Sequence, residues 1–230
     1  MHRMKRKPSI VGIGGTTRHN SSTEMAIRYA LSVSASMGAE TTLFSGPDLM
    51  FPMYAPDAQA QPGPAAAFIT ALRDCDGIII GSPGYHGSIS GLVKNALDYV
   101  EELKGDSRSY FDGRAVGCIV CAHGAQAAGT TLMALRSIVH ALRGWPTPLG
   151  VAINTSSCRF TADGSPTDPD TEKHLKILGS QVFDFAKTSA EKRASEYSCS
   201  SQKPTAMSVL AADMNSNTSP SSAVLALLSK

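Results

Sequence analysis

The chain has 230 residues, of which 42% are hydrophobic and 17% are charged, and its formal net charge is +2. This length suits one domain of ordinary size, and the apolar content is sufficient to bury a core. The nearly neutral charge gives no reason to expect a nucleic acid or an anionic membrane as a partner. Four basic side chains crowd residues 1–8, which we interpret as a flexible N-terminal segment.

No apolar run approaches the ~20 residues that a membrane-spanning helix needs. The basic residues at the start are not followed by the apolar stretch of a secretory signal. We therefore expect a cytoplasmic protein.

Five cysteines are present, an odd number without the spacing of a metal site, so we expect no bound metal. Cys118 and Cys121 lie in one apolar run, where three-residue spacing on a strand points the two side chains to opposite faces. We interpret them as buried thiols rather than a redox pair.

Apolar runs and helical spacings alternate along the chain. The apolar runs predict five strands, at residues 9–14, 40–44, 77–81, 114–122 and 147–154. The helical spacings predict five helices, at residues 22–37, 65–73, 91–103, 129–142 and 171–192. This alternation predicts an α/β fold, a flavodoxin-like doubly wound parallel sheet of order 2-1-3-4-5 with helices on both faces.

Two segments, residues 46–64 and the end of the chain, have a composition that disfavours regular structure. The loop at residues 46–64 is rich in proline. Separately, Trp145-Pro146 is expected to be a packed turn. From residue 194 the chain becomes rich in serine, threonine and asparagine. We therefore predict one domain over residues 9–193, followed by a disordered tail over residues 194–230.

The loop at residues 14–22, between the first strand and first helix, favours an anion. It is neither a Walker A sequence nor a Gly-x-Gly-x-x-Gly dinucleotide motif. Glycines, hydroxyls, an arginine and the N-terminus of a helix suit a single phosphate of a mononucleotide. The candidate residues of this phosphate loop are Gly15, Thr16, Arg18, Asn20, Ser21 and Ser22.

Two further loops follow strands at the same edge of the predicted sheet. The second loop, residues 81–91, has small residues that would let a flat ring approach the backbone, with one tyrosine and one histidine beside it. Its candidate binding residues are Pro83, Gly84, Tyr85, His86, Gly87 and Ser88. In the third loop, residues 122–129, His123 and Gly124 are candidates, because a backbone N–H there would stabilise negative charge on the ring.

These three loops resemble those of the NADPH-dependent FMN reductase family, and the likeness extends over roughly residues 9 to 190. The family pattern of the second loop is Ser/Thr-Pro-x-Tyr-x-x-Ser-x-x-Gly-x-x-Lys-Asn-x-x-Asp. In this chain it reads Ser82, Pro83, Tyr85, Ser88, Gly91, Lys94, Asn95 and Asp98. The phosphate loop departs from the family's Gly-Ser-x-Arg-x-x-Ser, because Gly15 and Thr16 replace the serine and Arg18 comes one place later.

The resemblance implies FMN as cofactor and NADPH or NADH as reductant, with hydride transfer at the flavin and therefore no assigned catalytic side chain. It also implies a homodimer or homotetramer, because two protomers of this family often pair across helices of this kind. Lys94, Asn95 and Asp98 stand at helical spacing, and we expect them to cap, pair or face a partner rather than to catalyse. At the position of Ser90, the azo- and quinone-reducing members often have proline. A serine at this position resembles the members that supply reduced flavin to a flavin-dependent monooxygenase.

Two alternatives to the FMN reductase stay open. An enzyme with tightly held FMN would reduce quinones, azo compounds or metal oxyanions. A flavodoxin-like electron carrier is the other alternative, although such carriers tend to be strongly acidic and this chain is not.

Overall fold

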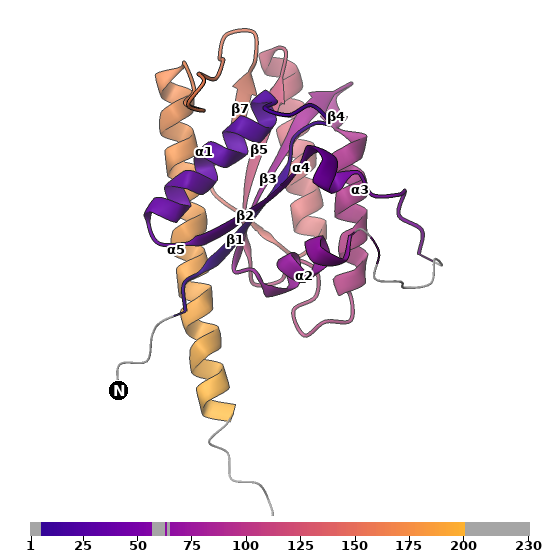
Figure 1. Ribbon diagram of the computed structural model, residues 1–230, viewed down its shortest axis with the longest axis vertical. Coiled ribbons are helices and arrows are strands. Elements are labelled where there is room, and N and C mark those ends of the chain that lie inside the picture. The colour runs from indigo at the N-terminus through magenta and orange to yellow at the C-terminus, as the bar shows by residue number, and fades with distance from the viewer. Residues whose placement is uncertain (1–5, 57–62, 64, 201–230) are drawn as a thin grey trace, which may run out of the picture. The chain divides into compact units, whose positions relative to one another are not determined.

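The computed structural model describes residues 6–56, 63 and 65–200, and strands alternate with helices throughout them (Figure 1). The strands are β1 Ser9–Gly14, β2 Glu40–Ser45, β3 Gly77–Tyr85, β4 Ser88–Ile89, β5 Ala115–Ala122, β6 Trp145–Pro146 and β7 Val151–Asn154. The α-helices are α1 Ser22–Ser36, α2 Ala66–Asp74, α3 Gly91–Asp98, α4 Ala125–Ala141 and α5 Pro169–Ser200. Two 3-10 helices are η1 Gly46–Leu49 and η2 Tyr99–Leu103.

The sheet has the predicted order. Its strands run β2-β1-β3-β5-β6 and pair in parallel, and β7 also pairs with β5. Strands β6 and β7 lie along the first and last parts of β5, so together they fill the fifth position. The order 2-1-3-4-5 is therefore confirmed, and the chain has a flavodoxin-like α/β fold.

The fifth strand differs from its prediction, because it is two short strands rather than one run over residues 147–154. Trp145-Pro146, expected as a turn, forms β6. Pro146 and Pro148 flank this break, and neither has an N–H group to donate to a ladder. The strand consequently resumes only at Val151.

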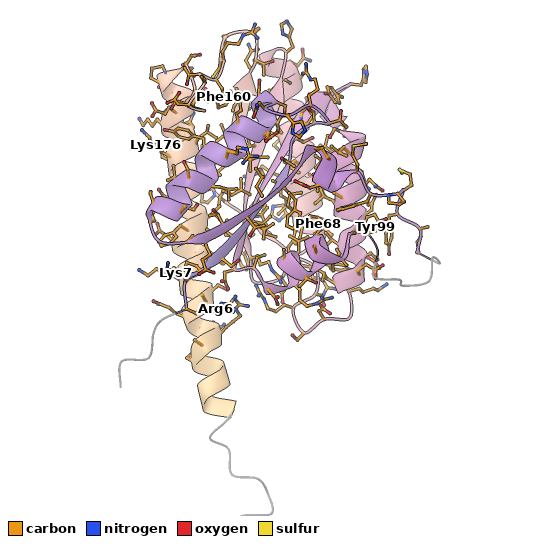
Figure 2. All side chains as sticks on the ribbon, in the orientation of Figure 1. Arg6, Lys7, Phe68, Tyr99, Phe160 and Lys176 are labelled. Carbon is orange, nitrogen blue, oxygen red and sulfur yellow. The ribbon has the colours of Figure 1, made fainter. Side chains whose placement is uncertain are left out.

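The sheet carries an apolar layer on each face, and side chains alternate between them along each strand. Ile78 and Ile80 of β3 pack into the layer with α2, α3 and α4, whereas Ile79 packs into the layer with α1 and α5. Figure 2 shows Phe68 among the side chains of the first layer. All three isoleucines are fully buried, as expected for a parallel sheet covered on both faces.

The prediction for the two strand cysteines is confirmed. Cys118 lies in the layer with α4 and Cys121 in the layer with α1 and α5. Both are free and buried, and burial raises the pKa of each thiol to about 12.

Several other elements differ from their predictions. Strand β3 continues to Tyr85 instead of ending at residue 81, and α4 begins at Ala125 instead of residue 129. The proline-rich loop opens with the 3-10 helix η1, where no regular structure was expected. Its residues 57–62 and 64 lie outside the described part of the chain.

The end of the chain forms a second compact unit, residues 192–230, of which only residues 192–200 are described. These are helical, so α5 extends beyond its predicted end at residue 192. Residues 201–230, most of the predicted tail, and residues 1–5 of the N-terminal segment lie outside the described residues. Within the described part of the chain, no helix is long and apolar enough to cross a membrane.

Candidate functional site

Strands β1 and β3 end side by side at the carboxyl edge of the sheet. Gly14 and Gly81 are register partners there, and a Cβ atom on Gly14 would lie 1.8 Å from the Gly81 carbonyl oxygen. The chain after β1 enters α1, which covers one face, and the chain after β3 leads to α3 on the other face. This divergence is the switch point at which open α/β sheets bind ligands.

The phosphate loop leaves β1 with a defined backbone conformation. Gly15 and Asn20 have positive φ angles of 103° and 55°. The Thr16 hydroxyl accepts from the Arg18 N–H at 3.1 Å, which closes a tight turn between them. Thr16 is half-buried, and Arg18 and Asn20 are exposed, so these three side chains are accessible to a ligand.

Ser21 is the N-cap of α1, as the sequence predicts for Ser21 or Ser22. Its side chain is buried, and its hydroxyl accepts from the Glu24 N–H at 3.3 Å. Ser22 begins the helix and is half-buried. The first turn of α1 therefore follows directly on the loop, with Ser22 as its first residue. Ser21 stabilises the start of the helix as its N-cap.

The second loop is a β-hairpin rather than the open loop expected from the sequence. Tyr85 of β3 pairs with Ser88 of β4, and the turn between them is His86-Gly87. These two residues have φ angles of 53° and 85°, the left-handed pair of a type I′ turn. Tyr85 is 51% exposed, and His86 and Ser88 are also exposed at this tip.

The base of the hairpin is tightly packed. A Cβ atom on Gly84 would lie 2.9 Å from the Ala122 Cβ and 3.0 Å from the Thr131 Oγ1. Ser82 is fully buried and accepts from the Ser90 N–H at 3.0 Å. Pro83, between these residues, is buried. The base of the hairpin thus packs against β5 and α4, and this packing fixes the position of the hairpin backbone relative to the sheet.

In the third loop, His123 is exposed and Gly124 is half-buried, with a φ angle of 115°. The Gly124 N–H donates to the Asn154 Oδ1 at 2.9 Å, so it is not available to a ligand. The first-turn N–H groups of α4, at residues 125–127, have no intrahelical partners, as at the start of any α-helix. No described side chain caps α4 by accepting a hydrogen bond from them. These groups, rather than the Gly124 N–H, are the candidates for stabilising a negative ring edge.

Asn154 has a role that the sequence reading missed. It ends β7 at the same sheet edge, and its Oδ1 also accepts from the backbone and hydroxyl of Ser156. Its place at the carboxyl end of a predicted strand was the available signal.

Asn95, one of the three polar residues of α3 expected to cap, pair or face a partner, points into the protein. It is 6% exposed, and its side chain accepts from the Tyr54 N–H at 2.9 Å and donates to the Pro52 carbonyl at 3.0 Å. The neighbouring Lys94 and Asp98 are exposed and pair with each other at 2.6 Å. Asn95 therefore anchors the segment that follows η1.

The three loops fit an anionic flavin nucleotide. None of them contains an aspartate or glutamate, and together they carry Arg18, three histidines and several hydroxyls. Gly84 stands where a side chain would collide with Ala122 and Thr131, so the hairpin packs closely on β5 and α4, and two helices begin at this edge. Such an edge can hold a phosphate on α1 and a flat ring against the hairpin and α4.

Comparison with known proteins agrees with this class of site. Residues 8–157 match the protein family described as NADPH-dependent FMN reductase. The FMN-dependent NADPH-azoreductase of Staphylococcus aureus is 34% identical over 116 residues, which is 50% of this chain and 58% of that protein. The chain therefore spans little more than half the length of that relative.

Solved structures show the same fold. FerB, a flavoenzyme NAD(P)H:(acceptor) oxidoreductase from Paracoccus denitrificans, superposes with a TM-score of 0.64 at 20% identity, over 79% of this chain and 98% of FerB. The apo form of the NADH:FMN oxidoreductase EmoB gives a TM-score of 0.59 at 17% identity, over 79% of this chain and 90% of EmoB.

Fold and site thus define a flavodoxin-like protein with a candidate ligand-binding edge at the carboxyl ends of its strands. The chain belongs to the NADPH-dependent FMN reductase family, a family of flavin oxidoreductases.

Proposed function

We propose that this protein is an NAD(P)H-dependent FMN reductase. The observation that carries the proposal is the acid-free edge built from the phosphate loop, the hairpin and the start of α4. The match of residues 8–157 to the FMN reductase family supports it. FMN bound at this edge would accept a hydride from the nicotinamide.

The side chains have positioning and electrostatic roles in this proposal. Thr16, Arg18, Asn20 and Ser22, with the N-terminus of α1, would hold the phosphate. The His86-Gly87 turn and the half-buried Gly84 would hold the ring against the sheet edge. The N–H groups at the start of α4 would stabilise negative charge on the reduced ring. Gly15, Ser21, Pro83 and Gly124 give these loops their shape, while Tyr85, Ser88 and His123 line the opening.

We further propose that reduced FMN leaves the protein to supply a flavin-dependent monooxygenase. The support is Ser90, which occupies the position where the family resemblance separates flavin suppliers from azo and quinone reductases. Its side chain is buried and caps α3 by accepting from the Val93 N–H at 3.3 Å. Ser90 therefore acts on the start of α3 rather than on the ring directly.

A second candidate function is favoured by the names of relatives. The Staphylococcus aureus protein is described as an FMN-dependent NADPH-azoreductase, which suggests that FMN stays bound and an azo compound is the acceptor. A cytoplasmic location and a homodimer or homotetramer belong to the proposal as well. Met133 on α4, 65% exposed, offers an apolar surface for such an assembly.

Steady-state kinetics separates the two candidates. A flavin-releasing reductase shows free FMN as a saturable substrate of NADPH or NADH oxidation, measured at 340 nm. An azoreductase instead copurifies with FMN, and its turnover saturates with the azo compound at a fixed FMN content. A protein that neither binds FMN nor oxidises NADPH or NADH in its presence would contradict both.

A further inference from the structure

A buried carboxylate lies directly behind the phosphate loop. Glu24 is in the first turn of α1 and is 3% exposed, although the loop itself contains no acidic residue. An acid at a helix N-terminus is favourable by itself, but here it shares that terminus with the proposed phosphate. Two negative charges at one helix end would repel each other unless the first is held and neutralised.

Glu24 is joined to the loop by two hydrogen bonds. Its Oε2 accepts from the Asn20 N–H at 3.0 Å, and its own N–H donates to the Ser21 hydroxyl at 3.3 Å. The Glu24 Cβ would also contact a Cβ atom on Gly15, at 3.5 Å. Asn20 is one of few non-glycine residues with a left-handed backbone, with φ at 55°. Asparagine tolerates this conformation, and the hydrogen bond to the carboxylate fixes Asn20 in it.

Arg28 neutralises this carboxylate from the outer side of α1. Its Nε and Nη2 donate to the Glu24 Oε1 at 2.9 and 2.7 Å, across one turn of the helix. The arginine side chain is 58% exposed, so its charge is screened by solvent on one side. The two carboxylate oxygens of Glu24 therefore have separate partners: Oε2 accepts from the Asn20 N–H of the loop, and Oε1 accepts from the Arg28 guanidinium.

We propose that Glu24 is a positioning residue for the flavin phosphate, because its carboxylate holds Asn20 in the left-handed conformation that shapes the phosphate loop, while Arg28 cancels its charge. This inference rests on the proposed function, since it needs FMN to bind at the loop. It assigns Glu24 and Arg28 no contact with the ring.

The test compares FMN with riboflavin, which has the same ring and no phosphate. Flavin fluorescence titration gives both dissociation constants, and their ratio measures the contribution of the phosphate. Glu24→Ala should lower the riboflavin-to-FMN ratio about tenfold, because the loop loses its anchor. Glu24→Gln keeps an oxygen for the Asn20 N–H and should keep the ratio within about threefold of wild type.

The charge role is tested with Arg28. Arg28→Ala leaves the carboxylate facing the phosphate and should lower the ratio at low salt, with a smaller effect at high salt. The double variant Glu24→Gln with Arg28→Ala should restore it. Arg73→Ala is the matched control, because Arg73 also bonds one carboxylate, that of Asp106, at 2.7 Å, but precedes β3 at the other end of the sheet.

A Glu24→Ala variant with the wild-type ratio would overturn the inference while leaving the proposed function intact. Equal weakening of FMN and riboflavin would also overturn it, since a general structural role predicts that pattern. Wild-type protein that binds no FMN would overturn the inference and the proposed function together. If Glu24→Ala does not fold, Arg28→Ala decides instead: a lowered ratio that the double variant restores supports the inference, and a wild-type ratio at low salt overturns it.

Discussion

The backbone N–H of Tyr54 donates to the side-chain Oδ1 of Asn95 at 2.9 Å, which ties the segment after η1 to helix α3. The Asn95 Nδ2 completes the tie by donating to the carbonyls of Phe51 and Pro52 at 3.3 and 3.0 Å. Tyr99 adds a hydroxyl that donates to the Pro52 carbonyl at 3.0 Å. An asparagine is suited to this place because it both accepts and donates.

Asn95→Asp should therefore destabilise the protein although the two side chains have nearly the same shape. The aspartate keeps the acceptor for Tyr54 but loses the donors and places a carboxylate oxygen beside two carbonyls. We expect the free energy of unfolding to fall by about 2 kcal/mol, measured by urea denaturation. Lys94→Ala is the control, because an exposed pair contributes at most about 1 kcal/mol. Equal stability of Asn95→Asp and wild type would contradict this role.

Gly84→Ala should weaken both the fold and flavin binding. The new methyl group would lie 2.9 Å from the Ala122 Cβ and 3.0 Å from the Thr131 Oγ1, so the hairpin has to shift. Overpacking of this kind costs about 1–3 kcal/mol, and the shift should raise the FMN dissociation constant. Gly105→Ala is the matched control, since a Cβ there meets nothing within 4 Å and its φ is not positive. Thermal unfolding and fluorescence titration of the two variants should differ clearly, and similar behaviour would refute the packing argument.

Two substitutions at His86 separate the effect of the backbone conformation of the turn from the effect of the imidazole side chain. Its φ of 53° is part of the turn, and asparagine tolerates that conformation whereas valine does not. His86→Asn should keep the unfolding free energy within about 0.5 kcal/mol, and His86→Val should lower it by about 1–2 kcal/mol. The FMN dissociation constant of His86→Asn then reports the imidazole alone. A valine variant as stable as wild type would show that the turn imposes no strain.

The buried thiols make stability fall at alkaline pH. Burial raises the pKa of Cys118 to about 12, from an ordinary value of 9.0, so folding favours the protonated thiol. This stabilisation is complete below pH 9 and is lost as pH rises toward 12. Unfolding free energies at pH 8 and pH 10.5 should decline less in Cys118→Ala than in wild type. A decline of the same size in both proteins would exclude this thiol as a cause.

Most of the fold could be predicted from the sequence because its signals are local. The run Ile78-Ile79-Ile80 indicates a strand buried on both faces, and the structure confirms it. A serine before a helical spacing, Ser21 or Ser22, predicts an N-cap, and Ser21 is that cap. The split between β6 and β7 differs from the single strand that the apolar run predicts, because Pro146 and Pro148 have no N–H group for a continuous ladder.

The candidate site was less predictable, because its contacts join residues far apart in the chain. The sequence pointed to the three loops but not to their conformation. The His86-Gly87 turn could have been read as a hairpin, since glycine in the second position is typical of type I′ turns. Asn95 and Asn154 could not have been paired with Tyr54 and Gly124 from spacing alone, because these hydrogen bonds depend on how the elements pack.

The most direct test of the proposed function is anaerobic stopped-flow mixing of the protein and FMN with NADPH, and separately with NADH. We expect at least one of the two nucleotides to bleach the flavin absorbance near 450 nm, at a rate that saturates with the nucleotide concentration. The bleaching should also require the protein. Bound flavin that stays oxidised with both nucleotides would contradict the reductase and leave only the electron carrier.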